Sequence, residues 1–231
     1  MKNLPLKLGI GVVLLFAAVI ATCLLWTPVK VRYYTNMLGS SDKNTRLSGV
    51  SELLAIGMKG NKALSNHYKC SEEEIEFLAK HWPKPNYAIP EDEYKRFPLY
   101  YASEYGFYVA VILLVERGAK VNARCSNGFT PLHRAAVGGH KRIASYLIEK
   151  DAIVNAKDGL DRIPLHYAAH HGHKEVITLL LEKKSIVNPK DYHTNYTPLD
   201  FAIDNDKKET VALLRAHGAK TAEELKKESR E

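Results

Sequence analysis

The chain has 231 residues, of which 45% are hydrophobic and 26% are charged, a balance that excludes an intrinsically disordered protein. The formal net charge is +7, but no segment carries the dense run of basic residues typical of a nucleic-acid-binding protein. The three cysteines, Cys23, Cys70 and Cys125, lack C-x-x-C spacing, which excludes a disulfide framework and a zinc knuckle. A single Cys70–Cys125 bridge stays open as an alternative to two small core residues.

The N-terminus is apolar. Residues 1–7 are a short basic N-terminus, and residues 8–26 follow without a single charged side chain. A helix rises about 1.5 Å per residue, so this run would extend about 28 Å, close to the hydrocarbon thickness of a bilayer. We therefore expect one transmembrane helix over residues 8–26 and a juxtamembrane linker over residues 27–40.

The same segment has a second interpretation. Small residues near Ala21 would suit cleavage of a secretory signal segment. The apolar run continues past that point to Trp26 and is long for a signal peptide, which favours a retained anchor. Basic residues flank both ends, and the short basic N-terminus slightly favours an extracytoplasmic location for the rest of the chain. The expected localisation is that of a single-pass membrane protein.

Residues 41–96 predict a helical N-terminal region. One helix is expected over residues 41–57, where apolar side chains recur at helical spacing. Ser71 and Glu74 are typical of a capping box that opens a second helix, which Pro83 ends. These helices are interpreted either as a separate cap on the domain that follows or as a degenerate copy of its repeat.

A repeated motif occupies residues 97–220. Pro-Leu pairs recur at intervals of 33, 33 and 34 residues, beginning at Pro98, Pro131, Pro164 and Pro198. An alanine follows each proline after four residues, and paired apolar residues follow later in each copy. This periodicity predicts two short helices per copy, which bury their apolar stripes only by stacking on neighbouring copies. The copies extend over about residues 97–127, 128–160, 161–194 and 195–220, and a polar tail over residues 221–231 follows.

Local signals set the ends of the first helix in each copy. Thr130 and Thr197, each directly before a proline, are expected to cap the helix start. Gly139 and Gly172 are expected to end that helix in a left-handed conformation. The second copy closes with Asp151 where a glycine closes the first, so a slightly different loop is expected there.

The motif resembles the ankyrin repeat. Residues 129–136 read FTPLHRAA and residues 163–169 read IPLHYAA, close to the family's T-P-L-H-x-A-A, and two Gly-His pairs follow. The resemblance implies an all-α ankyrin-repeat solenoid of four helix-turn-helix repeats with hairpin loops, preceded by a helical N-terminal cap and one transmembrane helix. The first and last copies have Tyr100 and Asp200 in place of the motif's histidine, as expected of terminal repeats.

A histidine cluster is the strongest hint of chemistry. His166 and His170 are one helical turn apart, and His171 and His173 follow. The resemblance implies that His166 bonds backbone in the neighbouring loop and that His173 is an ordinary motif residue, so no metal site is expected. No nucleophile, phosphate-loop or zinc-protease motif occurs, and the thiol of Cys125, at a predicted hairpin tip, has no activating neighbour. We expect no enzyme activity, no metal and no cofactor.

The remaining candidate is a protein-binding surface. In ankyrin-like stacks the hairpin tips and the inner face of each first helix form a groove that binds partners. Carried over to this chain, the groove comprises Glu104, Tyr105, Asn127, Phe129, Leu160, Arg162, His170, His171, His193, Tyr196, Asp204 and Asn205. Tyr105, Phe129, Leu160 and Tyr196 are expected to be exposed anchors.

These observations predict a membrane-tethered protein–protein interaction module, a scaffold or adaptor that binds a protein partner through this groove. The membrane contact is expected through residues 8–26, and neither nucleic acid nor a small-molecule substrate is expected. The alternative is an exported soluble binder or inhibitor, neutralising a toxin or a protease after signal cleavage.

Overall fold

The computed structural model describes residues 27–82, 93 and 96–230, so the apolar segment over residues 8–26 lies outside the described residues. The described residues form helices and loops, and no strand occurs among them. None of the described helices is both long enough and apolar enough to cross a bilayer. The chain divides into two compact units, Met1–Lys80 and His81–Glu231.

The first unit contains a helical stretch over residues 27–38, followed by α2 (Lys43–Ile56), α3 (Met58–Tyr68) and most of α4 (Glu72–His81). The expected helices correspond to α2 and α4. Asp42 caps α2 by accepting a 2.6 Å hydrogen bond from the Thr45 N–H, and Ser71 Oγ accepts from the Glu74 N–H at 3.1 Å. Both helix starts therefore follow from local side-chain caps.

Helix α3 had no counterpart in the sequence-based prediction. Its glycine and asparagine, Gly60 and Asn61, lower helix propensity and hide the element from a local pattern. A Cβ atom on Gly60 would lie 1.7 Å from the carbonyl oxygen of Leu53. The glycine therefore permits a close approach of α3 to α2 that no other residue allows.

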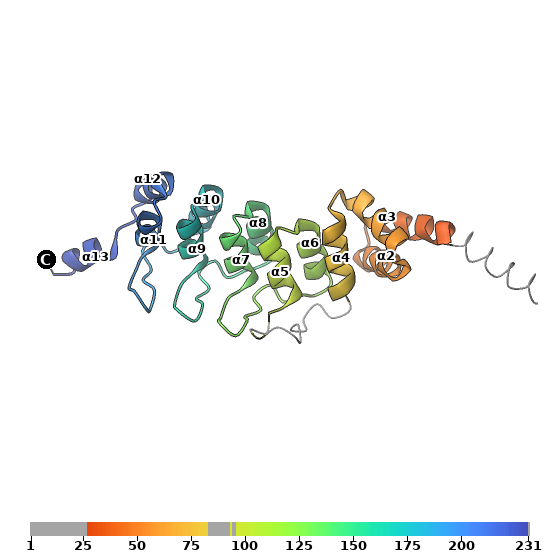
Figure 1. Cartoon of the computed structure of the whole chain (residues 1–231), viewed down its shortest axis with the longest axis horizontal. Helices are drawn as coiled ribbons and strands as arrows, with labels where there is room; N and C mark the ends of the chain where they lie inside the picture. Colours follow the sequence, from red (N-terminus) through yellow and green to blue (C-terminus); the bar gives the residue numbers. More distant parts are fainter. Residues whose placement is uncertain (1–26, 83–92, 94–95, 231) are drawn as a thin grey trace, which may run out of the picture. The chain divides into compact units, whose positions relative to one another are not determined.

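The second unit stacks four helix pairs within its described part (Figure 1). The pairs are α5 (Pro98–Tyr105) with α6 (Tyr108–Glu116), α7 (Pro131–Val137) with α8 (Lys141–Glu149), α9 (Pro164–His171) with α10 (Lys174–Glu182), and α11 (Pro198–Asp204) with α12 (Lys208–Ala216). First helices contact first helices, and second helices contact second helices. Long loops project to one side between consecutive pairs, and α13 (Ala222–Glu228) follows the stack.

The core of this unit follows the repeat motif. The motif alanines have no exposed surface, namely Ala102, Ala135, Ala168 and Ala202. Small side chains at this position allow neighbouring first helices to approach closely. Apolar residues of the second helices, such as Ile143 and Leu180, are also fully buried, so consecutive repeats share one continuous core.

The two threonines predicted to cap first helices, Thr130 and Thr197, both occupy the N-cap position. Thr197 caps α11 as expected, because its hydroxyl accepts a 3.4 Å hydrogen bond from the Asp200 N–H. Thr130 is likewise the N-cap residue of α7, and its hydroxyl lies 2.9 Å from His133 Nδ1. The imidazole takes part in this cap, because His133 Nδ1 accepts the Thr130 N–H at 3.2 Å.

Residues with a positive φ angle end helices at equivalent positions of successive repeats. Gly139 and Gly172 have φ angles of 71° and 80°, which confirms the predicted left-handed ends. Asp151 also takes a left-handed φ of 66°, where its counterpart Gly118 has 97°. The two loops thus share a left-handed turn and differ only slightly, as expected, because an aspartate tolerates this region better than most residues.

Three asparagines bind each closing loop to the next. Asn155 donates from Nδ2 to the Lys184 carbonyl at 3.4 Å and accepts the Ile186 N–H at 3.0 Å. The equivalent Asn122 and Asn188 make the same pair of bonds to their own following loops. A side-chain amide suits this position because it offers a donor and an acceptor together.

Candidate functional site

Arginines and aromatic residues alternate along the face where the hairpins meet the first helices. Two motif positions supply them, the second residue before each proline and the third residue after it. The first position carries Arg96, Phe129, Arg162 and Tyr196, and the second carries Tyr101, Arg134, Tyr167 and Phe201. We call these eight residues the arginine–aromatic band.

Members of the band stack on one another within and between repeats. The Arg134 guanidinium lies 4.7 Å from the ring centroid of Phe129, and that of Arg162 lies 4.8 Å from Phe201 in the next repeat. The ring centroids of Phe129 and Tyr167 are 5.0 Å apart. Cation–π contacts at such distances contribute about 0.5–2 kcal/mol each, so the band is a packed surface rather than a row of free side chains.

Acidic residues hold two of the arginines in place. Arg134 pairs with Glu104 of the preceding repeat at 3.3 Å. Arg162 donates from Nε at 3.0 Å and from Nη2 at 2.8 Å to Oδ2 of Asp191, whose side chain has no exposed surface. Each pair joins consecutive repeats, so the band is positioned by the stacking of the solenoid.

Asp191 also organises its own hairpin. Its Oδ1 accepts hydrogen bonds from the backbone and hydroxyl of Thr194 and from the Tyr196 N–H. Burial alone would raise the pKa of Asp191, but the hydrogen bonds from Thr194 and Arg162 outweigh it and hold the pKa below its usual value. The carboxylate is therefore charged and fully engaged at neutral pH.

Asp158 and Cys125 occupy the equivalent position in the two preceding hairpins. Asp158 accepts the N–H groups of Leu160 and Arg162, at 2.7 and 3.0 Å, and the hydroxyl of Tyr167. Cys125 is a buried free thiol that opens the turn at the hairpin tip, where its carbonyl accepts the Gly128 N–H at 2.8 Å. Cys70 is also free and belongs to the other unit, so the two cysteines form no bridge.

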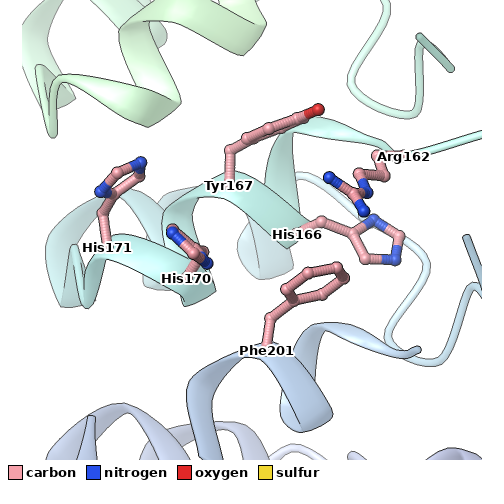
Figure 2. A pocket seen from close by; sticks show the side chains of 6 residues that line it. All are labelled: Arg162, His166, Tyr167, His170, His171 and Phe201. Atoms are coloured by element: carbon pink, nitrogen blue, oxygen red, sulfur yellow. The ribbon is translucent and has the colours of Figure 1, made fainter. Parts of the chain in front are cut away.

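A small pocket opens on this face beside α9. Its volume is about 130 Å³, and Figure 2 shows the six side chains that line it. Four come from α9, one from α11 and one from the segment before α9: His166, Tyr167, His170, His171, Phe201 and Arg162. Small-molecule sites usually measure about 300–1,000 Å³, so this pocket suits a single side chain.

His166 forms the base of the pocket. It is 1% exposed, and its Nδ1 accepts the Ile163 N–H at 3.0 Å. Nε2 makes no hydrogen bond of full geometry among the described residues, but the backbone of Tyr196 and of Pro189, in the loop that the resemblance implied, still interacts with the ring. The equivalent His133 reaches the Arg162 carbonyl at 3.1 Å, and the hairpin after His166 is one residue longer. Burial lowers the pKa of His166 to about 4.

His170 and His171 form the rim. The Nδ1 atom of His170 accepts the Asn205 side-chain N–H at 2.9 Å, which leaves the ring proton on Nε2. His171 is exposed, and its ring lies 4.7 Å from that of His170 and 5.8 Å from that of His173. Within the described part of the chain, no group of three or more His, Cys, Asp or Glu residues could hold a metal ion.

The twelve predicted groove residues all reach the surface. Six are exposed, namely Tyr105, Asn127, Leu160, His171, His193 and Asp204. The other six are partly buried, namely Glu104, Phe129, Arg162, His170, Tyr196 and Asn205. Phe129 and Tyr196 are thus not the exposed anchors that the sequence suggested, because both pack within the arginine–aromatic band.

Sequence reasoning missed the other half of the band. Tyr101, Arg134, Tyr167 and Phe201 were not among the predicted groove residues, although they alternate with the first row at a fixed motif position. The comparison of this position across the four copies would have revealed them.

Comparisons with known proteins agree with the repeat pattern. A family described as "Ankyrin repeats (3 copies)" matches residues 67–158 and 153–224, so the match includes α4. A "Putative ankyrin repeat protein" from Rickettsia bellii (strain RML369-C) is 33% identical over 108 residues, which are 46% of this chain. The chain spans 42% of the length of that relative.

Proposed function

Because the chain belongs to the ankyrin-repeat family, whose repeats serve as non-catalytic interaction modules, we propose that it binds a protein partner through the groove described above. The observation that carries this proposal is the arginine–aromatic band. Two of its three arginines, Arg134 and Arg162, are held by Glu104 and Asp191 before any partner arrives. A surface that is already ordered loses little conformational entropy on binding.

Exposed apolar residues beside the band supply the anchors. Tyr105 and Leu160 are 59% and 40% exposed, respectively, and lie on α5 and on the second hairpin. Aromatic and aliphatic side chains of this kind contribute most of the binding energy when a partner buries them. The partner is therefore expected to cover both the first helices and the hairpins.

A tether belongs to the same proposal. The uncharged run over residues 8–26 is long enough to cross a bilayer, and the short basic N-terminus slightly favours an extracytoplasmic repeat domain, although basic residues flank both ends. A membrane tether would raise the local concentration of the groove near a membrane-bound partner. The second candidate is an exported binder released by cleavage near Ala21, and the intact mass of the protein purified from its native membrane separates the two.

Partner capture tests the groove. The detergent-extracted full-length chain is compared with a variant in which Tyr105, Leu160, His171 and Asp204, all exposed, become alanine. A matched control carries alanine at Lys141, Glu175 and Lys183, which are exposed on the second helices or directly after one. A partner retained by the native chain and the control but lost from the groove variant supports the proposal. Equal retention by all three would overturn the groove assignment.

A further inference from the structure

The pocket beside α9 presents hydrogen-bond donors to a ligand. His170 uses Nδ1 to accept from Asn205, so its Nε2–H faces outward as a donor. The His171 ring makes no hydrogen bond within the described part of the chain. Arg162 gives two of the five N–H groups of a guanidinium to Asp191. Each of these three side chains can therefore donate to an incoming group.

The acceptors around the pocket are already occupied. Both oxygens of Asp191 accept hydrogen bonds from Arg162 and from its own hairpin. The carboxylate of Asp158 accepts from Tyr167 and from two backbone N–H groups. On α11, Asp204 is hydrogen-bonded to the Tyr196 hydroxyl. An incoming group must therefore supply its own acceptors.

The charges nearest the two rim histidines are positive. Burial is the main reason why the pKa of His170 lies below its ordinary value, and the positive charges of Arg162 and Lys207 lower it further. The pKa of His171 is lowered by burial and then by His170, His173 and Lys207. The positive charges of Arg162 and Lys207 near the histidines favour an anionic ligand, and the rings of Phe201 and Tyr167 offer apolar walls to a short aliphatic stem.

We propose that this pocket receives the carboxylate side chain of an aspartate or glutamate on the protein partner, with Arg162, His170 and His171 as its donors. The inference rests on the proposed function, since it names the chemistry of one contact within the groove. The pocket volume of about 130 Å³ fits one side chain. A carboxylate bound here also favours protonation of the His171 imidazole, whereas His170 keeps Nδ1 as the acceptor for Asn205, so binding takes up a proton at His171.

The pocket can be tested with a defined probe. The full-length chain in detergent micelles, with histidine labelled at the ε1 carbon, is titrated with N-acetyl-glutamate N-methylamide. Among the ten histidines, the resonances of His170 and His171 are expected to shift and saturate, with a Kd of about 1 mM or weaker. Binding should tighten from pH 7.5 to pH 5.5, because the free imidazole of His171 must gain a proton.

Matched controls test whether the pocket selects a carboxylate over other polar groups. The neutral glutamine analogue and the lysine analogue are expected to cause no saturable shift at His170 or His171. The double variant His170→Gln/His171→Gln should weaken binding of the glutamate analogue about tenfold, as followed by the resonance of His166, which also lines the pocket. The control His217→Gln, just after α12, should leave binding unchanged. Equal shifts with the glutamine analogue, or shifts of all histidines alike, would overturn the carboxylate site.

The two proposals fail in different ways. If the groove variant loses the partner but His170→Gln/His171→Gln retains it at full affinity, the groove stands and the carboxylate contact is wrong. If the pocket binds the glutamate analogue selectively while the four-alanine groove variant still retains the partner, the groove assignment fails although the pocket is real.

Discussion

Arg162 and Asp191 join the hairpins of consecutive repeats through two hydrogen bonds, of 3.0 and 2.8 Å, to one buried carboxylate oxygen. The same guanidinium lies 4.8 Å from the ring centroid of Phe201. The carboxylate thus fixes both the shape of its hairpin and the place of the arginine in the band. Structure and proposed function therefore depend on the same side chains.

Replacement of Asp191 by asparagine is expected to lower the free energy of unfolding by about 2–4 kcal/mol, because charge-assisted hydrogen bonds to a buried carboxylate are lost. Urea unfolding followed by circular dichroism measures the change in midpoint. Asp161→Asn is the matched control, since its partner Lys157 is exposed and such pairs contribute at most about 1 kcal/mol. An unchanged midpoint for Asp191→Asn would contradict the role assigned to this carboxylate.

The buried histidines make stability depend on pH. Burial lowers the pKa of His133 and of His166 to about 4 in the folded protein, whereas an unfolded histidine titrates near 6.5. The unfolded chain therefore binds more protons between these values, and stability is lost as the pH falls from about 6.5 towards 4. Each histidine should lower the free energy of unfolding by about 2 kcal/mol at pH 5 relative to pH 7.

Urea midpoints at pH 7 and pH 5 measure this loss. His133→Gln should reduce the difference between the two midpoints, although the variant is less stable at both pH values. Substitution of the exposed His193 by glutamine should leave the difference as it is in the native chain. Equal midpoints at pH 7 and pH 5 for the native chain would show that neither histidine is held neutral.

Replacement of Asn155 by alanine should lower the free energy of unfolding by about 2 kcal/mol, because one amide hydrogen-bonds two backbone groups of the following loop. Asn127→Ala is the control, since this asparagine lies exposed at a hairpin tip, where substitutions change stability by about 0.5 kcal/mol or less. Thermal and urea unfolding should rank the two variants in this order, and a reversed order would contradict the assigned role.

Two glycines in the first unit are expected to respond differently to alanine. Gly60→Ala should destabilise the unit by about 3 kcal/mol or more, because its Cβ would lie 1.7 Å from the Leu53 carbonyl oxygen. Gly57 has no atom within 4 Å of its Cβ position, so its alanine variant should cost about 1–3 kcal/mol through backbone strain alone, at φ 78° and ψ −140°. Hydrogen exchange of the α2 amides measures both effects, and equal protection in the two variants would refute the close packing.

The sequence by itself determined the repeat, its period and the helix pairs, because proline, alanine, glycine and leucine act on their own helix at fixed spacing. It also located the groove residues on the surface, since their motif positions follow from the period. Helix α3 escaped prediction because its packing depends on contact between Gly60 and a backbone carbonyl of α2, which leaves no local pattern.

Only the tertiary structure decided which side chains meet. Arg162 and Asp191 are 29 residues apart, and neither carries a local signal for the other. The same is true of Arg134 and Tyr100, which come together because consecutive first helices stack at close range. Local propensity sets where a helix begins and ends. Contacts between repeats depend on how the repeats stack, and this stacking forms both the arginine–aromatic band and the pocket beside it.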